Sequence, residues 1–145
     1  MTHPHRLARP VIFGLADGAM SIIGVILYTA GHAGLVFPVA FSGGVSAAVS
    51  MAGGEWLSES DNGPGASTAI GLATLAGSIT PALPYIILRG WQAVAVSVVL
   101  LVAVAAVVAR LRSNRMHPFL ETGAVLLVVL TASAACALLL PGGPG

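Results

Sequence analysis

The feature that most constrains the fold is a long uncharged stretch near the N-terminus. Residues 18–54 contain no Asp, Glu, Arg or Lys, whereas charged residues make up about a quarter of a typical soluble domain. A helix that crosses the hydrocarbon core of a bilayer needs about 20 apolar residues, so this stretch is long enough for two crossings. Two glycines in the segment AGHAG at 30–34 favour a turn between them. We therefore expect membrane-spanning helices over about 11–30 and 35–57.

The rest of the chain predicts three further spans and leaves no room for a soluble domain. Polar connections at 58–67 and 110–118 separate apolar segments that we expect to span the membrane over about 68–88, 91–109 and 119–140. The composition agrees, since 57% of the 145 residues are hydrophobic and only 8% are charged. The sequence thus predicts an all-α integral membrane protein with one transmembrane domain of five helices over 1–145, ending in a flexible tail at 141–145.

The arginines predict the orientation in the membrane. They cluster before the first span, at Arg6 and Arg9, and between the fourth and fifth spans, at 110–118. With five spans these two segments lie on one side, which the positive-inside rule makes the cytoplasm. The membrane would be the plasma membrane in a prokaryote and a vacuolar-type membrane in a eukaryote. A net charge of +1 lacks the basic excess that a nucleic-acid partner requires.

An acid inside the first span is the first candidate functional residue. An ionised Asp17 at this depth costs several kcal/mol unless it is paired, protonated or facing water, and such residues usually mark function. The alternative is an interfacial carboxylate that pairs with Arg9 or Arg6. Gly14 and Gly18 form a G-x-x-x-G pair beside the acid, a spacing that lets two helices approach closely. We expect this pair to pack the first helix against its copy in a homodimer.

A stripe on the second span ends in carboxylates. Gly43, Ala47, Met51, Glu55 and Glu59 recur every four residues and therefore share one side of a helix. At 1.5 Å per residue, Met51 lies about 9 Å inside the membrane, comparable to Asp17. Carboxylates bind divalent cations, and a thioether adds a preference for softer transition metals.

The predicted metal site therefore has four members, Asp17, Met51, Glu55 and, at its mouth, Glu59. Met20 and Asp61 are additional candidates for the metal site or pathway, although packing against lipid or core is the alternative for Met20. In the third span, Pro81 and Pro84 free backbone carbonyls and either kink the helix or line the pathway. No nucleophile–base pair or cofactor motif indicates an enzyme, so we expect no catalytic residues and no permanently bound cofactor.

The same residues carry a resemblance to a known family. An Asp-Gly pair in the first span, SMAGGEWLS at 50–58 and PALPY at 81–85 are similar to signatures of the vacuolar iron transporter family, in the same order along five spans. The resemblance implies a homodimer with a pathway between the first helices, which exports Fe²⁺ or Mn²⁺ from the cytoplasm in exchange for H⁺. It also implies that Asp17 and Met51 form the metal site within the membrane and Glu55 its cytoplasmic entrance.

The chain differs from many of these relatives in one connection. They extend the link between the second and third spans into a cytoplasmic metal-binding domain, whereas here it is only about residues 58–67. The sequence leaves Fe²⁺ versus Mn²⁺ open. Two other functions stay open as well, a small dimeric proton-coupled exporter of organic cations, with Phe13 and Tyr28 as aromatic candidates, and a membrane assembly subunit that transports nothing.

Overall fold

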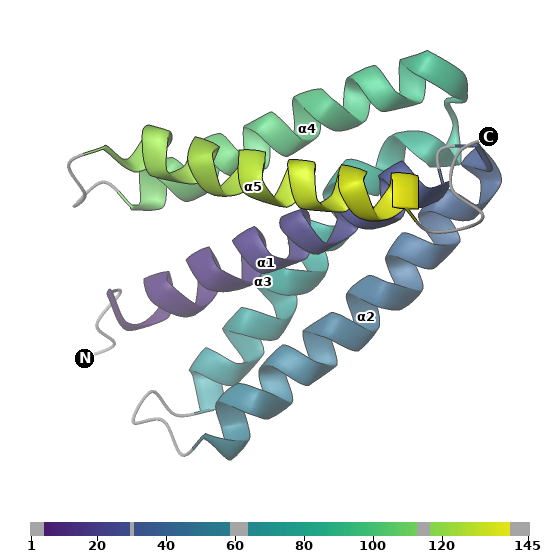
Figure 1. Ribbon diagram of the computed structural model, residues 1–145. Coiled ribbons are helices and arrows are strands. Elements are labelled where there is room, and N and C mark those ends of the chain that lie inside the picture. Colours follow the sequence, from purple (N-terminus) through teal and green to yellow (C-terminus); the bar gives the residue numbers. More distant parts are fainter. Residues whose placement is uncertain (1–4, 30, 59–63, 113–116, 140–145) are drawn as a thin grey trace.

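The computed structural model describes residues 5–29, 31–58, 64–112 and 117–139, and the side chains from Leu7 onward (Figure 1). These residues form five long helices and one short 3₁₀ turn. Every long helix is long and apolar enough to cross a membrane, and each corresponds to one predicted span. Three predictions lie outside the described residues: the candidate metal or pathway residues Glu59 and Asp61, and the flexible tail at 141–145. In chain order the elements are α1 His5–Thr29, α2 Ala33–Leu57, α3 Pro64–Ala82, η1 Leu83–Ile86, α4 Gly90–Leu111 and α5 Pro118–Leu139.

Helix α3 is the most buried helix of the bundle and packs mainly against α1 and α2. Four of its hydroxyl side chains donate to backbone carbonyls of the same helix, as a bilayer requires: Thr68, Thr74, Ser78 and Thr80. Thr74 donates to the Ile70 carbonyl and Ser78 to the Thr74 carbonyl, each at 2.9 Å. Because these bonds leave the side chains compact, neighbouring helices can approach α3 closely.

The glycine pair of α1 packs against α3 of the same chain. A Cβ added to Gly14 would lie 2.5 Å from the Ile70 carbonyl oxygen, and one added to Gly18 would overlap the Thr74 carbonyl oxygen. The prediction that Gly14 and Gly18 pack two copies together is therefore wrong for the folded chain. Small residues occur at helix crossings within one chain as well as between chains. The G-x-x-x-G spacing alone therefore does not distinguish a contact within the chain from a contact between copies.

Helix α2 presents a second small-residue surface to α3. Its buried residues recur every four positions, at Val36, Ala40, Gly44 and Ala48. A Cβ on Gly44 would lie 2.9 Å from the Ser78 Cβ, so this contact also depends on the absence of a side chain. The stripe that contains Met51 and Glu55 lies beside the buried one, and its first member Gly43 is exposed.

Two prolines end α3. Pro81 lies in its last turn, and Pro84 lies in η1, the 3₁₀ turn that follows. The Pro84 carbonyl accepts hydrogen bonds from the backbone N–H groups of Ile87 (3.2 Å) and Leu88 (2.7 Å), which closes the turn before α4. Both prolines are buried, and the α-helix gives way to the 3₁₀ turn at the position where the sequence predicts either a kink or a pathway lining.

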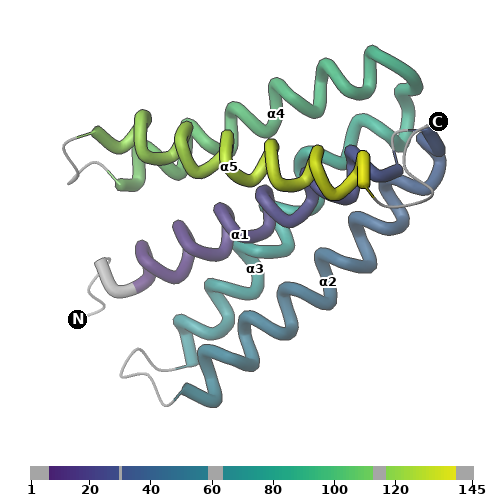
Figure 2. Tube along the Cα trace, viewed as in Figure 1, coloured from purple at the N-terminus to yellow at the C-terminus, as the bar shows by residue number. Residues whose placement is uncertain are grey.

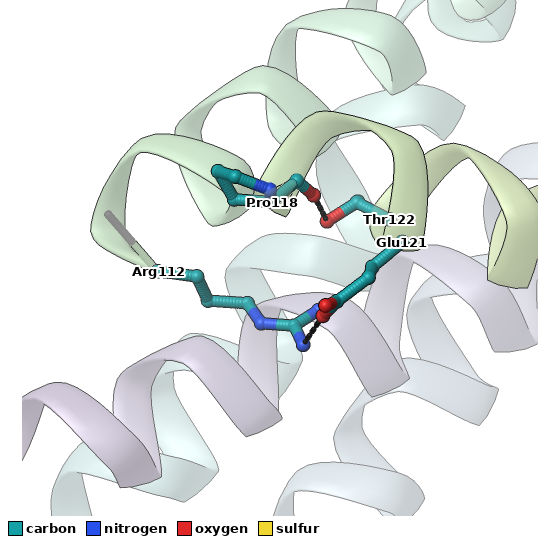
Figure 3. A network of polar contacts seen from close by, with 4 residues as sticks. All are labelled: Arg112, Pro118, Glu121 and Thr122. Atoms are coloured by element: carbon teal, nitrogen blue, oxygen red, sulfur yellow. Dashed lines mark hydrogen bonds and ion pairs between the residues drawn. The ribbon is translucent and has the colours of Figure 1, made fainter. Parts of the chain in front are cut away.

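Helices α4 and α5 contact each other and α1, and α1 passes between this pair and α2 in Figure 1. They are joined at one end by an ion pair, in which Arg112 Nη2 donates to Glu121 Oε2 at 2.8 Å (Figure 3). In the same first turn of α5, Thr122 donates to the Pro118 carbonyl at 2.7 Å. Most of their other side chains are exposed apolar residues, as expected for helices that face lipid.

Candidate functional site

A groove of about 700 Å³ lies where the N-terminal half of α1 meets the C-terminal half of α2. Because consecutive helices run in opposite directions, these two halves lie at the same end of the bundle, together with the start of α3 (Figure 2). The groove is lined by residues of three helices: Arg9, Pro10 and Phe13 of α1, Ser50, Met51, Gly54, Glu55 and Ser58 of α2, and Ile70 of α3.

Met51 and Glu55 lie one turn apart in this groove, and both side chains are half-buried. Their neighbours on the helix are small, with Ser50, Gly54 and Ser58 repeating every four residues alongside them. Ser58 folds back and donates from Oγ to the Glu55 carbonyl oxygen at 2.9 Å. A thioether and a carboxylate are thus brought together on one wall of an open groove, as the spacing along the second span predicts.

Asp17 lies near the groove without lining it. It follows Phe13 by one helical turn on α1, and its side chain is half-buried. Among the described side chains no ion pair joins Asp17 to Arg9, and the side chain of Arg6, the other partner considered for Asp17, lies outside the described residues. The acid lies on the side of α1 that also carries Arg9, Phe13 and Ser21, all exposed.

Met20 points away from this region. It lines a small apolar pocket between α1, α4 and α5, together with Leu101, Val108 and Leu126. The prediction of Met20 as an additional metal ligand is therefore wrong. Its thioether packs in the core, and packing against lipid or core was the alternative stated for this residue. The reason is that α4 and α5 cover this side of α1, which nothing in the residues around Met20 indicates.

The two prolines also lie outside the groove. Pro81 lines a different, apolar cavity of about 90 Å³ with residues of α1, α4 and α5. Within the described residues of one chain, no three His, Cys, Asp or Glu side chains come together as a metal cluster. The groove of a single chain therefore supplies one carboxylate and one thioether from the predicted set.

Sequence reasoning named Arg9 only as a partner for Asp17 and Phe13 only as an aromatic candidate, and it did not place either beside Met51 and Glu55. Both precede Asp17 at four-residue spacing, which was the available signal for them. Sequence reasoning missed Ser50, Gly54 and Ser58 as lining residues. Comparisons of the chain with protein-family models, with curated proteins and with solved structures found no match.

Proposed function

We propose that the protein exports a divalent transition metal, Fe²⁺ or Mn²⁺, from the cytoplasm in exchange for H⁺. The observation that carries the proposal is the pairing of Met51 and Glu55 on one wall of a groove at the end of a membrane bundle. The carboxylate attracts the cation, and the thioether favours a softer ion over Mg²⁺ or Ca²⁺. The resemblance to the vacuolar iron transporter family points to the same substrate.

The remaining ligands would come from a homodimer. Arg9, Phe13, Asp17 and Ser21 fall four residues apart on α1, and none of the four is buried within the chain. A second copy covering this side would remove an acid and a hydroxyl from lipid, where they are costly, and would bring two Asp17 carboxylates near two grooves. The proposed dimer surface is thus the Asp17 side of α1 and not its glycine side.

Cysteine crosslinking tests this dimer surface. In a Cys136→Ala background, Ser21→Cys is expected to crosslink between copies in the membrane, because Ser21 lies on the Asp17 side. Val128→Cys is the matched control, since Val128 is an exposed residue of α5. Crosslinks through Val128 and none through Ser21 would place the contact between copies on α5 instead.

Proton coupling follows from the chemistry of the proposed ligands. A carboxylate must be deprotonated to bind a metal, so binding releases protons and protons displace the metal. A site that opens alternately to a near-neutral cytoplasm and an acidic compartment would load metal on one side and lose it on the other. The arginines in the first turns of α1 and at the C-terminal end of α4 support the orientation in which the groove opens to the cytoplasm.

Metal uptake into proteoliposomes tests the proposal. The wild-type protein is expected to transport Fe²⁺ or Mn²⁺, and Asp17→Asn, which keeps the shape but loses the charge, is expected to abolish transport. Glu55→Gln at the mouth is expected to raise the metal concentration for half-maximal uptake more than it lowers the maximal rate. The control is Glu121→Gln, which removes an acid at the same end of the bundle that lies outside the groove. Full transport by Asp17→Asn would remove this residue from the mechanism.

One observation favours a second candidate function. Phe13 lines the groove opposite Glu55, and a cation held between an aromatic ring and a carboxylate is a recognised mode of organic-cation binding. The volume of about 700 Å³ falls in the range of small-molecule sites. Phe13→Leu discriminates the two functions, because it should leave metal uptake intact and weaken transport of a quaternary ammonium probe.

A further inference from the structure

The side chains that could ligate a metal ion in the groove all belong to one wall. They are a thioether, a carboxylate and two hydroxyls of α2: Met51, Glu55, Ser50 and Ser58. The lining residues from α1 and α3 offer a guanidinium and apolar side chains, which do not ligate metal ions: Arg9, Pro10, Phe13 and Ile70. Among the described lining residues of one chain, α2 therefore faces an arriving cation without ligands opposite it.

One helix wall cannot surround a divalent transition metal. Such an ion takes about four to six donor atoms at about 2.0–2.3 Å. Side chains one turn apart on a helix have Cβ atoms about 5–6 Å apart, and a helix accordingly places about two donors on one ion, as in metal sites with paired histidines one turn apart. Met51 and Glu55 are such a pair. About half of the coordination shell of an ion in the groove, or more, is then water.

The groove has room for an ion that keeps its water. Six water molecules occupy about 180 Å³ at about 30 Å³ each, whereas the groove has a volume of about 700 Å³. Glu55 is half-buried and Ser58 is exposed, so solvent reaches this part of the wall. A divalent cation polarises the water molecules that it binds, and these donate hydrogen bonds to a carboxylate, which accepts at both oxygens. Glu55 can therefore hold the ion through its water, without a direct metal–oxygen bond.

We propose that the groove captures the divalent metal as a hydrated ion, held by hydrogen bonds from its water to Glu55, and that the water is removed only further in. Removal takes place one turn deeper, where Met51 and the Asp17 carboxylates of two copies supply direct ligands. This inference rests on the proposed function and deepens it, because it names the form in which the substrate is recognised. Since Mg²⁺ gives up its water reluctantly, selection against Mg²⁺ falls on the deeper step and not on capture at Glu55.

An exchange-inert complex tests capture on the wild-type protein. Hexaamminecobalt(III) is close in size and shape to a hexahydrated metal ion, carries N–H donors in place of water, and keeps its ligands throughout an uptake measurement. It is added to proteoliposomes during uptake of whichever of Mn²⁺ and Fe²⁺ the protein transports. The complex is expected to compete, so that it raises the metal concentration for half-maximal uptake and leaves the maximal rate unchanged. Cobalt is expected to stay outside the vesicles, because the complex cannot lose its ligands.

Three variants separate capture from the deeper step. Glu55→Gln is expected to raise the concentration of the complex for half-inhibition on the order of tenfold, because one charge contact at a partly screened site is lost. Met51→Leu is expected to leave this concentration unchanged while it weakens metal uptake, since contact through water requires no sulfur. Glu121→Gln is the matched control and is expected to leave inhibition unchanged, because Glu121 is an acid at the same end of the bundle, outside the groove.

The outcomes separate the inference from the proposed function. Metal uptake that the complex does not inhibit would overturn hydrated capture while leaving metal export standing. Equal inhibition of wild-type protein and Glu55→Gln would also overturn it, because the complex would then bind elsewhere. Cobalt inside the vesicles would contradict removal of the water further in. Absence of Mn²⁺ and Fe²⁺ uptake by the wild-type protein would reject the proposed function, and the inference with it.

Discussion

At the scale of single residues, spacing along a helix predicted part of the site well. Met51 and Glu55 were expected on one side of the second span, and they line one groove. The failure at Met20 has a physical reason. Met20 follows Asp17 by three residues, so both could have faced one site, but α4 and α5 cover the Met20 side of α1. Those two helices are apolar on most sides, and nothing in them indicates where they dock.

The two methionines give a matched test at this scale. Met51→Leu nearly conserves volume and removes only the sulfur, so it is expected to weaken uptake of Fe²⁺ or Mn²⁺ while sparing any uptake of Mg²⁺. Met20→Leu makes the same change in a core pocket and is expected to leave selectivity unchanged. Competition between metals in the proteoliposome uptake measurement reports both effects. Equal loss for Mg²⁺ and Fe²⁺ in Met51→Leu would mean that the sulfur does not select the metal.

At the scale of helices, the number of long elements was predictable, whereas some limits and the packing partners were not: α1 begins at His5 and not near residue 11, and α3 begins at Pro64 and not near residue 68. Each predicted span corresponds to a helix, because about 20 apolar residues between polar connections leave few other choices. The G-x-x-x-G pair correctly indicated a close helix crossing. It did not indicate the partner, since α3 presents small residues that suit the glycines as well as a second α1 would.

A glycine pair tests the crossing of α1 and α3. Gly18→Ala is expected to destabilise the protein by about 1–3 kcal/mol, the usual cost of overpacking, because the new methyl group would overlap the Thr74 carbonyl. Gly43→Ala is the control, since a Cβ there meets nothing within 4 Å. It is expected to be neutral or to stabilise the helix by up to about 1 kcal/mol. Thermal unfolding in detergent measures both, and equal midpoints would argue against this packing.

At the scale of the whole molecule, the hydropathy of the five spans indicated which of them would be buried in the bundle. The third span is the least apolar of the five, and it becomes the most buried. Its Gly, Ala, Ser and Thr residues lower hydropathy, but they also allow α1 and α2 to approach, as small residues do within membranes. The groove is lined by the N-terminal half of α1, the C-terminal half of α2 and Ile70 of α3, and this combination of three helices was not predictable from any one span.

Exchange of metal for H⁺ is tested by following metal and protons in the same vesicles. Proteoliposomes with an acidic interior are loaded with one dye for the metal and another for internal pH, and Fe²⁺ or Mn²⁺ is added outside. We expect that metal entry alkalinises the interior, that collapse of the pH gradient slows metal entry, and that Asp17→Asn abolishes both signals. Metal entry that ignores the gradient and moves no protons would contradict exchange and make the protein a passive channel.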